Sequence, residues 1–193
     1  CRGATAYVPA ADAPVDSPAA RDLVAQARAP LTGPLFVRAI VAITSVASAL
    51  LMAPDILRRI VVVWLGGQPY YWPDTVEFNL KQDVRAARIV FDSGVPLVHI
   101  PCKNVAEHLR TTLPEMEAYV RGRGGIGGYL FRIYRDSAPD HFARSKVLWD
   151  ISTVAWLNNP DWGPTMLAPS PILRDDVTWA PTDARRRRVR VAT

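Results

Sequence analysis

Three apolar stretches rich in β-branched residues constrain the fold of this chain more than any other feature. They are residues 34–43, 58–67 and 96–102, and two stretches with helical spacing, 45–54 and 83–94, lie between them. The order strand, helix, strand, helix, strand with short connections is typical of parallel strands joined by crossover helices. We therefore predict an α/β fold with a mostly parallel, open sheet and helices on both of its faces.

The pattern becomes helical after residue 103. We expect helices at 104–110, 114–122, 126–135 and 146–157, and short strands at 177–180 and 188–192. The glycine-rich segment 122–130 lacks the G-x-x-x-x-G-K-[ST] pattern of a phosphate loop and follows no strand, so it predicts a flexible loop before a helix. A length of 193 residues suits a single domain spanning 1–193 with a helical C-terminal part.

Composition and charge exclude several functional classes. The net charge of +5 equals the number of arginines within residues 185–190, so the excess is local and nucleic acid is not expected as a partner. The longest uncharged run, 39–54, is shorter than the roughly 18–20 residues of a membrane helix, and no membrane segment is predicted. Cys1 and Cys102 cannot form a disulfide framework or a Cys-x-x-Cys zinc site, which favours a reducing cytoplasm.

Two polar side chains stand at the end of the second predicted strand. Glu77 and Asn79 flank Phe78 in the segment between the Gly66-Gly67 turn and the helix at 83–94. A loop that only turned the chain would use Gly, Pro, Ser or Asp, and ligands of open α/β sheets bind at the carboxyl ends of the strands. The pair is therefore a candidate for binding hydroxyl groups. Spacing alone equally allows both side chains to cap the following helix.

Three longer motifs resemble one enzyme family. Residues 39–67, 76–101 and 145–162 contain A-I-V-A-I-T-S-V-A, V-E-F-N-L-K-Q-D-V-R-A-A-R-I-V-F and S-K-V-L-W-D-I-S-T-V-A in the order and spacing of the inosine–uridine-preferring nucleoside hydrolases. The resemblance implies hydrolysis of the N-glycosidic bond of ribonucleosides to ribose and free base, with a calcium-bound water. It also implies a cytoplasmic salvage enzyme that is a homo-oligomer.

The resemblance assigns roles to five residues. Thr44 occupies the position whose backbone carbonyl binds calcium, and Asp150 that of a calcium-binding carboxylate. Glu77 and Asn79 match the residues that hydrogen-bond the ribose hydroxyls. Trp149 stands where many members have a histidine that protonates the leaving base, and it resembles purine-preferring members in which an indole stacks on that base. Oxygen ligands suit calcium, and fixed hydrogen bonds to the hydroxyls suit an oxocarbenium-like transition state.

The chain also departs from the family pattern. The acidic cluster D-x-D-x-G-x-D-D, which supplies most calcium ligands in the family, has no counterpart, and segment 68–76 lacks the ribose-binding asparagine that often occurs there. We therefore expect a fragment truncated at both ends that is inactive on its own. The alternative hypothesis is a non-catalytic nucleoside- or sugar-binding protein on the same scaffold.

Each candidate residue also has a purely structural explanation. Thr44 could cap a helix, Asp150 could stabilise a helix dipole, and Trp149 could be a half-buried core aromatic. His99 lies in an apolar strand and is expected to be a core residue with satisfied hydrogen bonds. Cys102 is expected to be a small buried side chain at a strand end.

Overall fold

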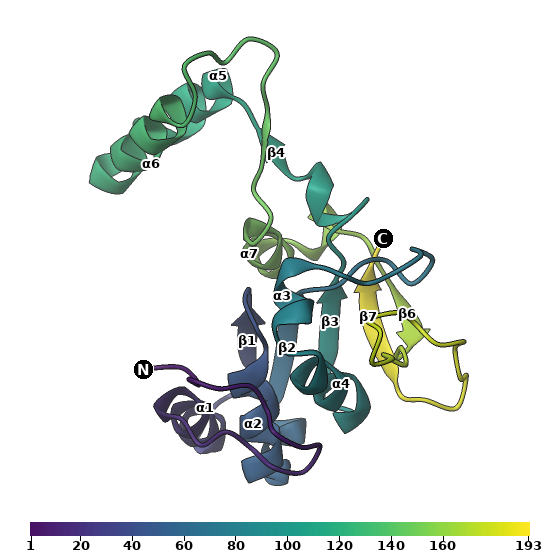
Figure 1. The fold of residues 1–193 in the computed structure, drawn as a ribbon. Helices are drawn as coiled ribbons and strands as arrows, with labels where there is room; N and C mark the ends of the chain where they lie inside the picture. The colour runs from purple at the N-terminus through teal and green to yellow at the C-terminus, as the bar shows by residue number, and fades with distance from the viewer.

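The computed structural model describes residues 1–193 and has a five-stranded sheet at its centre (Figure 1). The strands lie in the order β1-β2-β3-β7-β6, and their bounds are β1 Leu35–Ala39, β2 Ile60–Leu65, β3 Leu97–Ile100, β7 Arg188–Ala192 and β6 Thr165–Pro169. β1, β2, β3 and β7 are parallel, and β6 is antiparallel to β7. The predicted mostly parallel sheet is confirmed. β6 was not predicted, and residues 177–180 form no strand.

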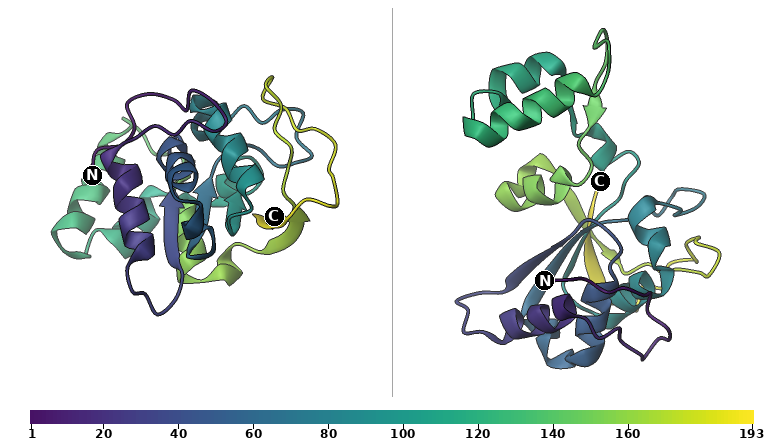
Figure 2. Two further views of the ribbon diagram at one scale, coloured as in Figure 1. Left: turned by 90° about the horizontal axis from the view of Figure 1, so that it is seen from below. Right: turned by 60° about the vertical axis from the view of Figure 1, so that its left-hand side comes forward.

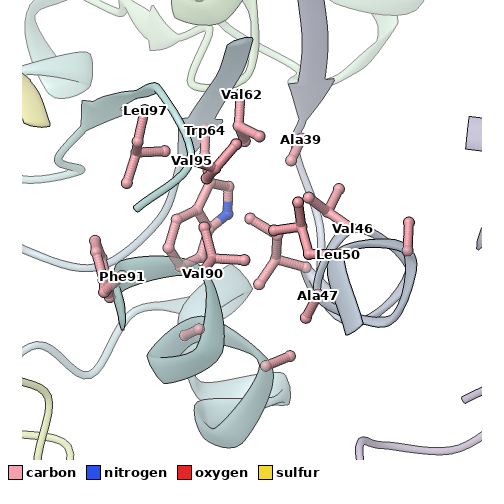
Figure 3. Close-up of a cluster of buried hydrophobic side chains, with 14 of the residues drawn as sticks. Ala39, Val46, Ala47, Leu50, Val62, Trp64, Val90, Phe91, Val95 and Leu97 are labelled. Atoms are coloured by element: carbon pink, nitrogen blue, oxygen red, sulfur yellow. The ribbon is translucent and has the colours of Figure 1, made fainter. Parts of the chain in front are cut away.

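Three helices cover one face of the sheet and enclose the larger core. They are α1 Pro18–Arg28, α2 Thr44–Met52 and α4 Val84–Ser93. Ser17 caps α1 and precedes a proline in its first turn, and Gly94 ends α4 in the left-handed region (φ 77°). Trp64 of β2 is fully buried in this core, and Figure 3 shows it among side chains of α2 and α4.

The opposite face carries a smaller core beneath α7 Ile151–Asn158. Its fully buried members come from β2, β3, β7 and the 3-10 turn Ala106–His108: Val63, Leu65, Val98, Ile100, Ala106 and Ala192. Trp149 and Trp156 pack against this cluster. Helices therefore lie on both faces, as predicted, with most of the apolar burial on the side of α1, α2 and α4.

A helical arm follows β3 and projects from the sheet (Figures 1 and 2). It contains α5 Leu113–Glu115, a π-helical turn Met116–Val120 and α6 Gly124–Asp136, and it rests on a two-stranded ribbon of β4 Arg110–Thr111 and β5 Lys146–Val147. The predicted loop at 122–130 was wrong, because the first turns of α6 occupy most of it. The helix predicted at 146–157 begins only at Ile151, because residues 146–147 pair with β4.

The basic segment near the C-terminus is part of the folded body. Arg186 is partly buried, and its guanidinium donates to the carbonyls of Ser170 (2.7 Å) and Phe91 (3.2 Å). The segment leads directly into β7. Because β7 lies in the sheet between β3 and β6, its pairing holds the end of the segment in place. No helix of the structure combines the length and the apolar character that a membrane crossing requires.

Candidate functional site

A cavity of about 540 Å³ lies at the carboxyl ends of the parallel strands. Ile40 and Val41 follow β1, Gln68 follows β2, and Cys102 and Lys103 follow β3. Four of the five predicted site residues also line it: Glu77, Asn79, Trp149 and Asp150. Parallel strands bring these segments together because their carboxyl ends share one edge of the sheet. The volume is within the range of small-molecule sites.

Glu77 precedes the short helix α3 Phe78–Gln82 and caps it. Its carboxylate accepts hydrogen bonds from the backbone N–H groups of Gly67 (2.9 Å), Asn79 (3.0 Å) and Leu80 (3.0 Å), and only 7% of the residue is exposed. The capping explanation of Glu77 therefore holds in the structure. These contacts also join the Gly66-Gly67 turn to α3, so Glu77 fixes the wall of the cavity whether or not it contacts a ligand.

Asn79 does not cap a helix, and its side chain extends from α3 to the end of β2. The amide nitrogen donates to the carbonyl of Leu65 (3.0 Å), and the residue is buried. One amide hydrogen and the amide oxygen remain for other partners. This orientation, set by the backbone of β2, places a fixed polar group against the cavity and next to Asp150.

Asp150 immediately precedes α7, but its side chain makes no capping hydrogen bond. Partial burial raises the pKa of this carboxyl above its ordinary value, and the side chain of Asn79 opposes that shift. An Asp–Asn pair at the floor of a cavity offers both acceptors and a donor. Such a pair can orient vicinal hydroxyl groups or contribute an oxygen ligand to a cation.

Trp149 has a left-handed backbone, with φ of 32°. This conformation costs a non-glycine residue roughly 1–2 kcal/mol, and such residues are concentrated at functional sites. The ring packs against the smaller core and also lines the cavity. Trp149 is thus a half-buried aromatic that packs against the core, as the structural explanation expected. Its ring also forms one wall of the cavity, where a planar ligand could stack on it.

Thr44 lies apart from the other four predicted residues. It lines a neighbouring hollow that shares Val41 with the cavity. Thr44 does not cap α2, because the cap position belongs to Ile43; its hydroxyl instead donates to the buried carboxylate of Asp83 (2.6 Å). The structural explanation that the Thr44 side chain caps this helix was therefore wrong.

The residues of this chain do not by themselves fit a calcium ion. No group of three or more His, Cys, Asp or Glu side chains is arranged to hold a metal. Glu77 is occupied by backbone amides, which leaves Asp150 as the acidic side chain of the cavity with an open carboxylate. Calcium takes six to eight oxygen ligands, so one carboxylate and a carbonyl in an adjoining hollow are too few.

A buried polar network behind the cavity was only partly expected. His99 is fully buried; Nε2 lies 2.6 Å from the Gly66 carbonyl and Nδ1 lies 3.0 Å from the Tyr70 hydroxyl. These contacts fit a neutral ring that donates to Gly66 and accepts from Tyr70, and burial lowers the pKa of His99 to about 4 and raises that of Tyr70. The prediction of a satisfied core histidine is confirmed. The network holds the turn that carries Gly67 against Glu77.

Sequence reasoning missed two groups that shape the cavity. Gln68 accepts from the backbone N–H of Lys103 (3.0 Å) and donates to the carbonyl of Val76 (3.3 Å), which ties the strand ends together. Its position directly after a Gly-Gly turn at a strand end was the available signal. Cys102, expected as a buried hydrophobe, is half-buried in the cavity, and burial raises the pKa of its thiol to about 11.

Comparison with known proteins shows which family the chain resembles. The family model described as inosine-uridine preferring nucleoside hydrolase matches residues 3–193. A putative pyrimidine-specific ribonucleoside hydrolase RihB of Shigella boydii is 31% identical over 127 residues, which are 62% of this chain and 52% of the relative. The pyrimidine-specific ribonucleoside hydrolase RihB of Escherichia coli O1:K1 is 30% identical over the same share of this chain and 40% of its own length. The chain thus spans about half or less of the curated relatives that it matches.

Solved structures share the fold. An inosine-uridine preferring nucleoside hydrolase from Bacillus anthracis superimposes with a TM-score of 0.71 and 21% identity, over 91% of this chain and 60% of that one. A purine-preferring ribonucleoside hydrolase from Gardnerella vaginalis gives 0.69 and 22%, over 92% and 60%. At this identity the likeness establishes the α/β architecture described above.

Proposed function

This chain belongs to the inosine-uridine preferring nucleoside hydrolase family, and we propose that the complete protein hydrolyses the N-glycosidic bond of ribonucleosides to ribose and free base. The observation that carries the proposal is the meeting of Asn79, Trp149 and Asp150 in one cavity at the carboxyl ends of the strands. A polar floor and an aromatic wall match the two halves of a nucleoside. Action in the cytoplasm and as a homo-oligomer belongs to the same proposal.

The ribose is proposed to bind at the polar floor. The Asn79 amide is held by the Leu65 carbonyl and lies next to Asp150, so both groups are positioned before a ligand arrives. Cleavage builds oxocarbenium character on the sugar, and pre-positioned hydrogen bonds to its hydroxyls orient and distort the ring. Glu77 contributes either a direct contact to the ribose or the position of α3, which it fixes by accepting hydrogen bonds from three backbone amides.

The base is proposed to stack on Trp149. The indole is supported from behind by the smaller core, so it does not need to be ordered on binding. A two-ring purine overlaps an indole more than a pyrimidine does, which is why we propose a purine-leaning preference. The two RihB relatives are named as pyrimidine-specific, so competition between inosine and uridine for the complete protein is the direct test. A uridine preference would remove the stacking argument.

We also propose that the complete site binds a calcium ion, and we name only the ligands that this chain would contribute. Asp150 and the backbone carbonyl of Thr44 are the proposed contributions of this chain to a calcium ion, and the remaining oxygen ligands would have to come from outside residues 1–193. We derive no catalytic step through the ion from the residues present.

The test of the proposed function is Asp150→Asn in the complete protein. The substitution keeps the size of the side chain and removes its charge, so kcat/KM for inosine should fall by on the order of 100-fold or more. The exposed Asp140 on the arm gives a matched control, and Asp140→Asn should leave kcat/KM unchanged. An unaltered kcat/KM in Asp150→Asn would remove Asp150 from the site.

The second candidate function is nucleoside or sugar binding without turnover. It is favoured by one observation, the lack of an acidic cluster around Asp150. Equilibrium binding of inosine in the presence and absence of a chelator separates the two candidates. Binding that is independent of divalent cations, in a complete protein without hydrolysis, would favour this candidate over the enzyme.

A further inference from the structure

A second cavity lies beside helix α7, apart from the candidate site. Its volume is about 270 Å³, and it shares no lining residue with the cavity around Asp150. Its walls come from α7, the ends of β3 and β7, and the 3-10 turns Ala106–His108 and Pro160–Trp162. Figures 1 and 2 show α7 between the sheet and the arm. Neither the proposed reaction nor the candidate site uses this cavity.

The lining of the second cavity is mainly apolar and contains no Asp, Glu, Lys or Arg. Trp156 and the exposed Trp162 provide two aromatic rings, and the exposed His108 is the one titratable residue of the lining. The other apolar members are Ile100, Val105, Ala106, Leu109, Ala155 and Ala192. A carboxylate, phosphate or ammonium group placed here would lose its hydration without gaining an opposite charge. The lining therefore favours an uncharged occupant.

Two polar atoms of the lining residues have no hydrogen-bond partner in the chain. They are the hydroxyl oxygen of Ser152 and the indole nitrogen of Trp156, and both atoms are buried. Buried polar groups in proteins are usually hydrogen-bonded, and leaving one unpaired costs free energy. Ser152 and Trp156 are four residues apart on α7, so their side chains lie on the same face of the helix. The cavity thus has one polar side, formed by α7, that lacks a partner.

The two unpaired groups define the polar part of an occupant. An indole N–H can only donate, whereas a serine hydroxyl can both donate and accept. One hydroxyl group between them can accept from Trp156 and share a second hydrogen bond with Ser152. A nucleobase or a sugar carries more polar atoms than this pair can serve, and its remaining polar atoms would be buried unpaired. The pair therefore fits a ligand with a single hydroxyl group.

The volume of the cavity sets the size of the apolar part. An apolar cavity of about 150 Å³ is large enough to bind benzene, so 270 Å³ holds a six-membered ring with a substituent. Aromatic rings pack favourably against other rings, and Trp156 and Trp162 offer such surfaces. A rigid ring also loses less conformational freedom on binding than a flexible aliphatic chain. The space therefore suits a small aromatic compound.

We propose that the cavity beside α7 binds a small uncharged aromatic compound of the phenol class, whose hydroxyl group lies between Ser152 and Trp156. The inference is independent of the proposed reaction. It has a consequence for the candidate site, because α7 begins directly after Asp150, and Trp149 and Trp156 pack against the same smaller core. A ligand in this cavity supports the helix that follows Asp150.

Fluorine NMR of 4-fluorophenol added to the complete protein tests the proposal. The probe has the proposed ring and hydroxyl group, and its signal should shift and broaden in a saturable way. Fluorobenzene is the matched probe without the hydroxyl group. It should bind about tenfold more weakly, because it leaves Ser152 and Trp156 unpaired.

Filling the cavity should remove the site. Ala155→Leu adds an isopropyl group at the wall formed by α7, and it should weaken binding of both probes by on the order of tenfold or more. Gly163→Val fills the space from another wall, where an added β-carbon would lie 3.6 Å from the Trp156 ring, and it should have the same effect. Ala118→Leu, at an exposed site on the arm, is the matched control and should change neither Kd.

Trp156→Phe tests the hydrogen bond itself. Phenylalanine keeps an aromatic ring against the cavity but has no N–H group. The affinity for 4-fluorophenol should therefore fall about tenfold, whereas the Kd of fluorobenzene should change by less than about twofold. Circular dichroism checks that each variant is folded.

Three results would overturn the proposal. The first is a wild-type protein that binds neither probe saturably. The second is binding of 4-fluorophenol that survives both Ala155→Leu and Gly163→Val, which would place the probe elsewhere on the protein. The third is an equal loss of affinity for both probes in Trp156→Phe, which would mean that the indole N–H makes no hydrogen bond to the ligand.

Discussion

The body of the molecule and its arm are built in different ways. The sheet with α1, α2 and α4 encloses a cluster of 24 buried apolar residues, whereas the arm around α6 encloses three. The body also contains buried polar anchors; the carboxylate of Asp83 accepts from Val8 N–H (3.0 Å), Thr44 Oγ1 (2.6 Å) and Ala86 N–H (3.0 Å). The arm has one comparable link, from the Tyr134 hydroxyl to the Thr111 carbonyl (3.0 Å). We infer that the body unfolds as one unit and that the arm opens separately.

The difference suits the proposed site in the body. A site that must hold Asn79, Trp149 and Asp150 in fixed positions needs a scaffold whose parts cannot move independently. The arm leaves apolar side chains such as Ile126 and Ile133 67% and 48% exposed, which limits how much apolar area it buries by itself. The stability that the site requires therefore comes from the body.

The largest expected effect comes from Trp64→Ala in the body. Trp64 of β2 is fully buried in the larger core, in contact with Phe91 (ring centroids 5.5 Å apart). Its truncation should leave a cavity and lower the free energy of unfolding by about 3–5 kcal/mol. Urea denaturation followed by circular dichroism measures this. Trp162→Ala, at a 69% exposed site, is the control, and an equal loss in both variants would show that the body is not the stable unit.

The next largest effect is a pH dependence that belongs to the body. The pKa of His99 is lowered to about 4 in the folded protein, against about 6.5 in an unfolded chain. The unfolded chain therefore binds the proton first as pH falls. The contribution of His99 to the free energy of unfolding is fully present above pH 6.5. It is lost between pH 6.5 and 4, by on the order of 3 kcal/mol.

The variant His99→Gln separates the pH-dependent contribution of His99 to stability from that of the other titrating groups. Glutamine keeps a donor for the Gly66 carbonyl but does not titrate. The difference in unfolding free energy between wild type and variant, measured from pH 7.5 down to 4, should shrink as pH falls. A difference that is constant with pH would mean that the pKa of His99 is the same in the folded and the unfolded protein.

The same contrast explains how much of the fold follows from sequence. β2 and β3 are predictable because Ile60–Leu65 and Leu97–Ile100 are almost wholly buried and therefore read as continuous apolar runs. β1 lies at the sheet edge with Phe36 48% exposed, and it is predictable only because its sequence is nevertheless apolar over 34–43. β6 pairs on one side only, at the sheet edge, and keeps Met166 and Leu167 exposed, so it lacks that pattern. In the arm, glycines with low helix propensity hid the start of α6, and pairing with β4 displaced the start of α7.

The candidate site was predictable to the extent that it depends on strand ends. Asn79, Trp149 and Asp150 were placed from motifs, and the parallel sheet brings them together. The sequence could not decide whether Glu77 caps α3 or binds ribose, because both roles use the same carboxylate at the same position. The separation of Thr44 from the cavity depends on its long-range hydrogen bond with Asp83, which no local pattern encodes.

The smallest expected effect on global stability comes from Phe131→Ala in the arm. Phe131 is the central member of the arm's three-residue core, with Arg121 stacked over its ring at 5.2 Å. A buried Phe→Ala usually costs 3–5 kcal/mol, but a region that opens locally cannot lose more than its own opening free energy. The arm should therefore open while the unfolding midpoint of the body changes by less than about 1 kcal/mol.

Hydrogen exchange with residue resolution distinguishes the two regions in that variant. Amides of α6 should exchange at nearly unprotected rates, whereas amides of β2 and β3 should keep wild-type protection. Arg132→Ala, which changes an exposed neighbour on the same helix, should leave both regions unchanged. If β2 loses protection together with α6, the arm and the body form one cooperative unit.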